Sequence, residues 1–253
     1  KITEKLKIDL YTHVCDNKES QDIFRSFFLA GVPEVDGPTD IALVEVMFRA
    51  ASKYNITYVL EGHSFLAEGV SPLGTAYVDE KYIQSIHNKF GKIPMKTFPN
   101  MNLVKFLYWS VFKNIKKIRP FWYFNYSKDE AKKILKDNFD WVDYGGHHLE
   151  NRMTAFHHSY YNPIKFDLDQ RNNSLAAKVR SGLLSRDKAL EEYSKPPFIE
   201  KNLEEYIQKR FEMSKIEFEN TLKSPKKYYT DYKTYKRSFE LLKPLFYLLV
   251  KFN

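Results

Sequence analysis

The residues best suited to chemistry lie together in one short stretch, 143–154, which reads DYGGHHLENRMT. Its glycine pair, 145–146, lets the backbone turn or approach a ligand closely. His148 and Glu150 follow, and both suit acid–base work near neutral pH. The planar fork of Arg152 suits a phosphate or a carboxylate. We therefore predict that this stretch binds substrate and transfers protons.

A second candidate site follows a predicted short, buried strand, Ile56–Leu60. Gly62 permits close approach of a ligand, and the next two residues, His63 and Ser64, can donate hydrogen bonds to phosphate. Glu68 could hold Mg²⁺. A plain strand-to-helix turn capped by the serine explains the same residues equally well.

The histidines and a later charged run leave alternatives open. Zinc binding by the histidine pairs 147–148 and 157–158 is one, although sequence neighbours rarely point at one ion. Surface or helix-packing histidines are another. The run Lys165–Arg171 is charged enough to be a solvated turn. The lone Cys15 excludes a disulfide or a cysteine-based zinc site within this chain.

Strands alternate with helices in the first part of the chain. The residue pattern predicts a strand over Ile8–Cys15, a helix over Ser20–Ala30 and a helix over Ile41–Tyr54, capped by Thr39 or Asp40, before the strand described above. This alternation is typical of a parallel α/β sheet, in which ligands bind beyond the carboxyl ends of the strands.

The rest of the chain is predicted to be helical. We expect helices over Thr97–Arg119, over Ser127–Asn138 and, in two pieces around Ser185, over Arg180–Tyr193. The basic residues of the helix over Thr97–Arg119 indicate a packed helix with a solvated basic face. A surface helix that contacts anionic lipid is the alternative. A basic, aromatic, helical tail follows from Phe198.

Composition limits the choice of partner and compartment. The 253 residues carry a formal charge of +8, which suits nucleotides, nucleotide-sugars, nucleic acid or an anionic membrane. The longest apolar run, Met101–Phe112, is too short to span a bilayer. The first residue is a lysine, which predicts that the sequence begins inside a longer protein. We expect a cytoplasmic location, with the inner face of the membrane as an open possibility.

Many short motifs in a fixed order resemble the N-acetyl sugar amidotransferase (WbpG-like) family. These enzymes are PP-loop ATP pyrophosphatases, a branch of the adenine nucleotide α-hydrolase (HUP) fold. The residues that carry the resemblance are Pro38-Thr39-Asp40, Gly62-His63-Ser64, Ala67-Glu68-Gly69, Tyr82 to His87, Phe90-Gly91, Thr97-Phe98-Pro99, Asp143-Tyr144-Gly145-Gly146, His148, Glu150, Thr154, Lys165-Phe166, Asp169, Arg171, Ser181-Gly182 and Arg186 to Leu190.

The resemblance implies a reaction in lipopolysaccharide or O-antigen synthesis. ATP activates the acetamido oxygen of a sugar, and ammonia from a glutaminase-type partner displaces AMP to leave an acetamidino group. ATP, Mg²⁺ and a sugar-nucleotide would then share one site. The implied roles are catalysis for His148 and Glu150, ATP binding for Thr39, Asp40, Gly62, His63 and Ser64, Mg²⁺ binding for Glu68, and substrate binding for Tyr144, Gly145, Gly146, Arg152, Thr154, Lys165 and Arg171.

The sequence also departs from the family pattern. The Ser-Gly-Gly-x-Asp-Ser loop that binds pyrophosphate is absent and is expected before Lys1. A lysine usual after the glycines is His147, an arginine usual before Phe156 is Ala155, and the basic cluster after Asp169 is reduced. These departures bear on substrate and activity.

We predict an α/β fold with a partial Rossmann-like parallel sheet of the HUP type over residues 1–95. A helical substrate-specificity region over 96–197 and the tail over 198–253 follow. Two other functions stay open: a catalytically degenerate binding or scaffold protein that docks partners or an anionic membrane, and a tRNA-modifying PP-loop enzyme. The absence of a paired-cysteine sulfur-transfer motif speaks weakly against the tRNA-modifying enzyme. We expect no nucleic-acid partner, and the oligomeric state stays open.

Overall fold

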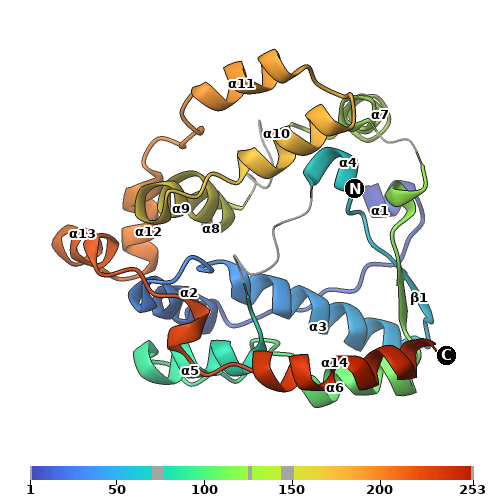
Figure 1. The fold of residues 1–253 in the computed structure, drawn as a ribbon, viewed down its shortest axis with the longest axis horizontal. Coiled ribbons are helices and arrows are strands. Elements are labelled where there is room, and N and C mark those ends of the chain that lie inside the picture. Colours follow the sequence, from blue (N-terminus) through green and yellow to red (C-terminus); the bar gives the residue numbers. More distant parts are fainter. Residues whose placement is uncertain (1, 70–76, 125–126, 144–150, 252–253) are drawn as a thin grey trace.

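The computed structural model describes residues 2–69, 77–124, 127–143 and 151–251, and it is mostly helical (Figure 1). In chain order its elements are α1 (Ile2–Lys5), α2 (Asn17–Ala30), α3 (Gly37–Lys53), β1 (Tyr58–Leu60), α4 (Phe65–Glu68), α5 (Glu80–Phe90), α6 (Leu103–Leu107), the π-helix η1 (Tyr108–Phe112), β2 (Lys116–Ile118), the 3₁₀ helix η2 (Pro120–Trp122), α7 (Lys128–Phe139), α8 (Arg152–Ala155), the π-helix η3 (Phe156–Tyr161), α9 (Asn162–Phe166), α10 (Arg171–Arg180), α11 (Arg186–Ser194), α12 (Leu203–Arg210), α13 (Lys215–Lys223), the 3₁₀ helix η4 (Tyr229–Asp231) and α14 (Lys236–Lys251).

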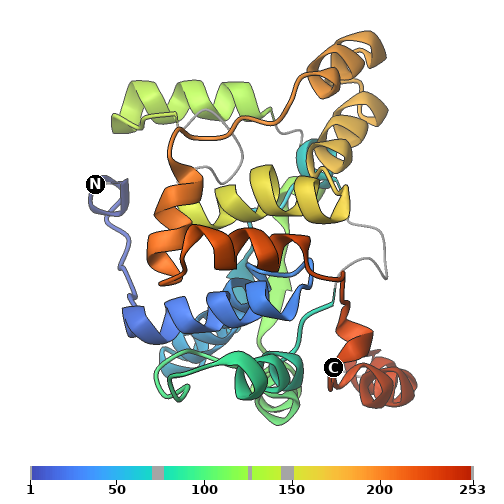
Figure 2. The same cartoon turned by 90° about the vertical axis from the view of Figure 1, so that its left-hand side faces the viewer.

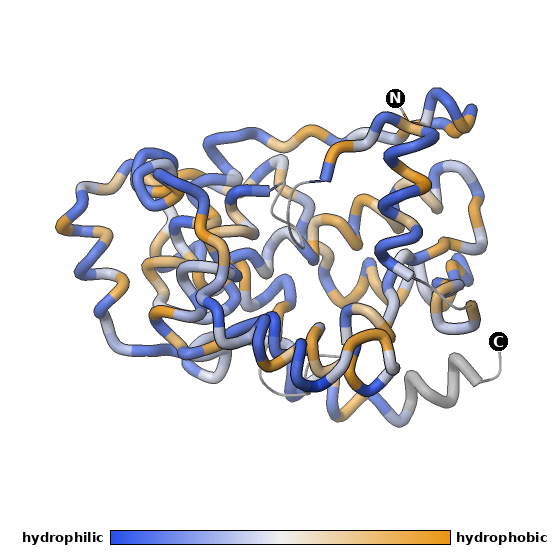
Figure 3. The backbone as a smooth tube through the Cα atoms, turned by 90° about the horizontal axis from the view of Figure 1, so that it is seen from above, coloured by the Kyte–Doolittle hydropathy of each residue, from blue (hydrophilic) through white to orange (hydrophobic). Residues whose placement is uncertain are grey.

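Side-chain caps set where several helices begin. Ser127 accepts a hydrogen bond from the third residue of α7, and Ser185 does the same for α11, as their sequence positions predicted. Asp16 caps α2, which ends at Gly31 in the left-handed region with φ 68°. Hydrophobic and hydrophilic residues alternate along the helical segments, as amphipathic helices require (Figure 3).

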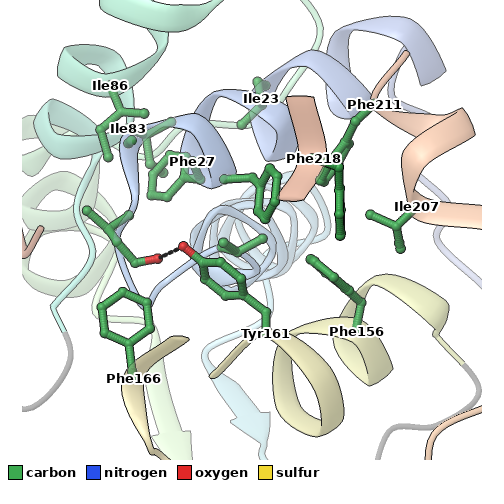
Figure 4. Close-up of a cluster of buried hydrophobic side chains, with 14 of the residues drawn as sticks. Ile23, Phe27, Ile83, Ile86, Phe156, Tyr161, Phe166, Ile207, Phe211 and Phe218 are labelled. Atoms are coloured by element: carbon green, nitrogen blue, oxygen red, sulfur yellow. Dashed lines mark hydrogen bonds between the residues drawn. The ribbon is translucent and has the colours of Figure 1, made fainter. Parts of the chain in front are cut away.

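The main core surrounds α2. Phe28 on this helix stacks on Phe218 of α13 with ring centroids 4.8 Å apart, and it also contacts Phe156 and Tyr161 of η3. Figure 4 shows Phe156, Tyr161 and Phe218 pointing into this core, and Figure 2 shows α2 beneath α13, with the α8–η3–α9 helix above. α5 packs on the same helix through Ile83 and its neighbours. Segments far apart in the sequence therefore close one core.

The described residues contain a two-stranded sheet in which β1 and β2 run parallel. Tyr58 pairs with Lys116, and Leu60 pairs with Ile118. The strand Ile56–Leu60 was predicted to be buried, which is wrong: Tyr58 is 59% exposed and Leu60 71% exposed. A mostly helical chain with a small parallel sheet agrees with the α/β class at a coarse level. The Rossmann-like HUP type is not confirmed by two strands and stays a prediction, as do the three regions proposed from the sequence.

Two predicted elements are wrong. Ile8–Cys15 is irregular, because a strand needs a backbone partner and this segment is tied instead by side-chain contacts. The ring of His13 contacts the carbonyl of Thr97 (3.4 Å), and the backbone N–H of Asp16, just after the segment, donates to the Oγ1 of Thr97.

The helix expected over Thr97–Arg119 is instead α6, η1 and β2. Asn102 caps α6, which delays the helix start, and Asn114 lies in the left-handed region with φ 50°. Asparagine tolerates that conformation, and there the chain leaves the helix and extends into β2.

The cap predicted for the helix over Ile41–Tyr54, which is α3 in the structure, is also wrong. α3 begins at Gly37, and Pro38 occupies its first turn, where a proline fits well. Asp36 is therefore the capping position, and Thr39 lies within the first turn. None of the described helices has the length and apolar composition that a membrane-spanning helix needs.

Candidate functional site

The carboxyl ends of β1 and β2 meet at one edge of the sheet, where parallel sheets bind ligands. Glu61 follows β1 and forms ion pairs with Lys117 in β2 (2.8 Å) and with Arg119 just after β2 (2.7 Å). Burial alone would raise the pKa of Glu61, but the two cations and their hydrogen bonds lower it below its ordinary value. The glutamate thus remains charged and fastens the two strand ends together.

His63 is fixed by both ring nitrogens. The indole N–H of Trp122 donates to Nδ1 (3.3 Å), so Nε2 carries the proton and donates to the carbonyl of Gly69 (3.2 Å). The guanidinium of Arg119 lies 4.8 Å from the centre of the Trp122 ring, and Phe65 meets the same ring edge-on. In this arrangement His63 positions the loop and has no N–H left for a phosphate.

On either side of this histidine, Gly62 has open space beside its backbone and Ser64 has a hydroxyl without a hydrogen-bond partner. A Cβ atom added to Gly62 would meet no atom within 4 Å, so the space beside its backbone is open. Ser64 is fully buried, and its Oγ has no hydrogen-bond partner. A buried hydroxyl without a partner is unfavourable, and a ligand oxygen could satisfy it. Glu68 closes the same segment at the end of α4.

The segment that carries these residues is held against α10. Gly69 has φ 79° and lies so close to the carbonyl of Asn173 that a side chain there would collide with it. Ser181, just beyond α10, donates to the carbonyl of Leu66 in α4 (3.3 Å). The loop after β1 therefore rests on a helix that lies about a hundred residues later in the chain.

A second group of predicted residues meets at the start of α3. Asp36 accepts a hydrogen bond from Thr39 on one carboxylate oxygen (2.6 Å) and from Thr154 on the other (2.6 Å). Thr39 was assigned to the ATP side and Thr154 to the sugar side. The structure brings the two together through an aspartate that sequence reasoning missed.

The loop before Asp36 is clamped by the π-helix η3. Tyr161 donates its hydroxyl to the carbonyl of Val32 (3.0 Å), and His157 donates Nε2–H to the carbonyl of Pro33 (2.7 Å). Burial lowers the pKa of His157 to about 4, so the ring is neutral at physiological pH. π-helical turns are frequent at functional sites, and this one aims two polar side chains at a single loop.

Glu34, in the same loop, is a buried acid. It accepts hydrogen bonds from the hydroxyl of Tyr82 (3.1 Å) and from the backbone N–H of Tyr77 (3.3 Å). Burial raises the pKa of Glu34 in spite of these two donors. No motif in the sequence marks this glutamate, and its position in a Gly- and Pro-containing loop is the one signal that could have pointed to it.

The predicted arginines already have carboxylate partners. Arg152 makes two hydrogen bonds to Glu200 (3.0 and 2.6 Å) and lies 4.7 Å from the ring centre of Tyr206. Arg171 forms a comparable pair with Asp169. Both charges are therefore compensated within the chain, and binding of a substrate anion would compete with these pairs.

Lys165 is 5% exposed, and its ammonium nitrogen lies within hydrogen-bond distance of four oxygen atoms near the end of α13. Three are the carbonyl oxygens of Thr221 (3.1 Å), Leu222 (2.9 Å) and Ser224 (2.7 Å), and the fourth is the hydroxyl of Ser224 (3.1 Å). Burial, together with the nearby Lys226, lowers the pKa of Lys165. In this structure the lysine caps a helix, and its predicted role as an anion anchor stays untested.

Several predicted site residues cannot be placed. Tyr144, Gly145, Gly146, His148 and Glu150 lie outside the described residues, as does His147. Asp40 is exposed in the first turn of α3. Within the described ranges, no group of three or more His, Cys, Asp or Glu residues is arranged to hold a metal ion. Mg²⁺ binding at Glu68 therefore stays a prediction.

Comparison with known proteins supports the resemblance in one region. Residues 150–245 match the family model described as "LPS biosynthesis protein WbpG-like, C-terminal domain". Searches of curated proteins and of solved structures gave no significant match. The matched range contains the residues that clamp the 32–36 loop, whereas the loop after β1 lies outside it. Residues 150–245 of this chain are thus similar to the C-terminal domain of WbpG-like lipopolysaccharide-biosynthesis proteins.

Proposed function

We propose that this chain acts in the biosynthesis of lipopolysaccharide or a related surface polysaccharide, as part of an ATP-dependent sugar amidotransferase. The observation that carries the proposal is the WbpG-like domain over residues 150–245. The reaction would replace the acetamido oxygen of a (nucleotide-)sugar with nitrogen from ammonia, leaving an acetamidino group, with ATP converted to AMP and pyrophosphate.

The carboxyl edge of the sheet supports a nucleotide site. Open space beside Gly62 would let a phosphate approach the backbone, and the unpartnered Oγ of Ser64 would donate to it. Glu68 would supply a carboxylate for Mg²⁺, which ATP-using enzymes employ to neutralise phosphate charge. His63, whose ring nitrogens are both engaged, would hold the loop in shape.

The stretch around residue 150 would hold the sugar and move protons. Thr154 is anchored to Asp36, so the start of α8 is tied to the start of α3. His148 or Glu150 would take the proton that incoming ammonia must lose, because imidazole and carboxylate groups serve as general bases. A glutaminase-type subunit would deliver the ammonia.

Turnover in the complete protein tests the proposal. The protein is incubated with ATP, Mg²⁺, an ammonium salt and N-acetylated nucleotide-sugars, and AMP release is measured together with the mass of the sugar. The expected product shows exchange of one oxygen for an NH group. AMP release without this mass change, or neither, would contradict the amidotransferase assignment.

Two sets of variants test the residue roles. Gly62→Ala should leave stability unchanged, because the added methyl meets no protein atom, yet should slow ATP consumption by crowding the phosphate. His148→Ala and Glu150→Ala should lower turnover by about a hundredfold or more if either transfers the proton. Unchanged turnover in both would remove these two residues from the mechanism. Salt-sensitive flotation with anionic vesicles, without ATP affinity, would instead favour the scaffold alternative.

A further inference from the structure

A cavity of about 610 Å³ lies on a part of the chain that the proposed reaction does not use. Its walls come from the segment before α2, from α3 and α5, and from the segment 95–105 that leads into α6. None of its lining residues belongs to the loop after β1 or to the matched C-terminal domain. Its size falls in the range of pockets that hold small molecules.

Glu45 is the central polar group of this cavity. Its side chain is 1% exposed, and one carboxylate oxygen, Oε1, accepts from Arg49 (2.5 Å) and Lys105 (3.1 Å). The other oxygen, Oε2, is buried and has no hydrogen-bond partner. A buried carboxylate oxygen normally takes a donor, so the half-used carboxylate points to a missing one.

Asn100 offers a second acceptor in the same cavity. Its Nδ2 donates to the carbonyl of Glu80 (3.4 Å), which fixes Oδ1 as the free end of the amide. Oδ1 is buried and, like Oε2 of Glu45, has no donor. Two buried acceptors on separate elements, both lining one cavity, together describe a ligand with at least two O–H or N–H donors.

The charges around the two acceptors select the ligand further. Glu45 neutralises one of its two cations, so the group that it forms with Arg49 and Lys105 keeps one positive charge. The side chains of both cations are more than a third exposed, at 39% and 46%, and can turn toward a ligand. Lys96 adds a further cation to the lining, and Glu80 adds an acid. An anion is therefore favoured over a neutral zwitterion or a cation.

We propose that this cavity is a binding site for a small hydroxylated anion, of the sugar-phosphate or sugar-acid class. Ligand hydroxyls would donate to Oε2 of Glu45 and Oδ1 of Asn100, and the anionic group would face Arg49 and Lys105. The site is separate from the carboxyl edge of the sheet, so the inference does not depend on the amidotransferase proposal.

Isothermal titration calorimetry of the complete protein tests the site, with glucose 6-phosphate as the probe and without ATP. Glucose, which lacks the anion, and inorganic phosphate, which lacks the sugar hydroxyls, are the matched ligands. We expect saturable, salt-sensitive binding of glucose 6-phosphate and weaker binding of the other two. No saturable binding of the probe, or equal affinity for inorganic phosphate or for glucose, would overturn the proposal.

Variants locate the binding. Glu45→Gln should weaken affinity for glucose 6-phosphate by about tenfold or more, because it replaces a charged acceptor. Asn100→Ala should weaken affinity by about fivefold. It removes an oxygen that no protein group uses and one long hydrogen bond from Nδ2 to the carbonyl of Glu80, so it keeps the test valid if Glu45→Gln fails to fold. Glu191→Gln, on the exposed face of α11, is the matched control. Wild-type affinity in a folded Asn100→Ala variant would place the ligand elsewhere and refute the site.

Discussion

Replacing Lys165 with methionine should destabilise the protein, although the sequence assigned this lysine to substrate binding. Its ammonium group hydrogen-bonds three carbonyl groups at the end of α13, where helix carbonyls lack their usual N–H partners. One of the three, that of Thr221, also accepts from Ser224. Each hydrogen bond to a charged group contributes about 1.5–3 kcal/mol, and desolvation of the buried ammonium offsets part of the sum. Methionine fills most of the space, so we expect a net loss of about 2–4 kcal/mol.

Urea unfolding followed by far-UV circular dichroism measures this loss. A destabilisation of that size corresponds to a melting temperature lower by about 5–15 °C in a chain of this length. Lys226→Met is the matched control, because it removes an exposed lysine close to the same helix end. Its effect should stay within about 0.5 kcal/mol.

A Lys165→Met variant as stable as the Lys226→Met control would refute the capping argument. The ammonium would then contribute no net stability, and its burial would need another reason. Binding of the sugar substrate would become the better explanation, which the turnover assay can test directly with the same stable variant.

Three further predictions concern buried polar groups. Burial raises the pKa of Glu19, but four hydrogen-bond donors outweigh it and hold this pKa below its ordinary value. The stability that Glu19 contributes is therefore complete above about pH 4.3 and is lost as the pH falls through the lowered pKa. Glu19→Gln should flatten this fall in stability at acid pH, measured by urea unfolding at several pH values. His157 has its pKa lowered from 6.5 to about 4, so the unfolded chain binds the proton first and stability should fall by up to about 3 kcal/mol as the pH drops from 6.5 to 4. His157→Gln should remove that dependence, and a persisting slope would show that other groups cause it. Thr154→Val should cost about 1–2 kcal/mol in urea unfolding, because Asp36 loses a donor; a cost near zero would mean that water replaces the hydroxyl.

Local signals predicted helix starts well. Ser127 and Ser185 cap helices because a serine hydroxyl can accept hydrogen bonds from backbone N–H groups two or three residues away. Such a cap depends on only a few adjacent residues, so the local sequence is enough to predict it. The strand Ile8–Cys15 and the helix Thr97–Arg119 failed for the opposite reason. A strand depends on a partner that periodicity does not reveal, and a single left-handed residue, Asn114, redirected the second segment.

The candidate site was predicted only in part. The loop Gly62–Ser64 follows a strand at the sheet edge, as the alternation of strands and helices indicated. The clamp on the loop before α3 was missed, because His157 and Thr154 meet residues more than a hundred positions earlier in the chain. A histidine inside an aromatic run indicates burial, but the sequence does not show which residue it contacts.

The parallel pairing of β1 with β2 also has a consequence for how the chain folds. Tyr58 must find Lys116 across the whole length of α4, α5, α6 and η1, because parallel neighbours cannot be joined by a tight turn. Closing so long a loop is entropically unfavourable until other contacts hold its ends. α2 and α5 are separated by a comparable stretch of chain, but they bury apolar side chains such as Ile23 and Ile83 against each other, whereas Tyr58 and Leu60 stay exposed in the sheet. We therefore expect the helical core to assemble first and the strands to pair late, so that the carboxyl edge of the sheet is the last part to take shape.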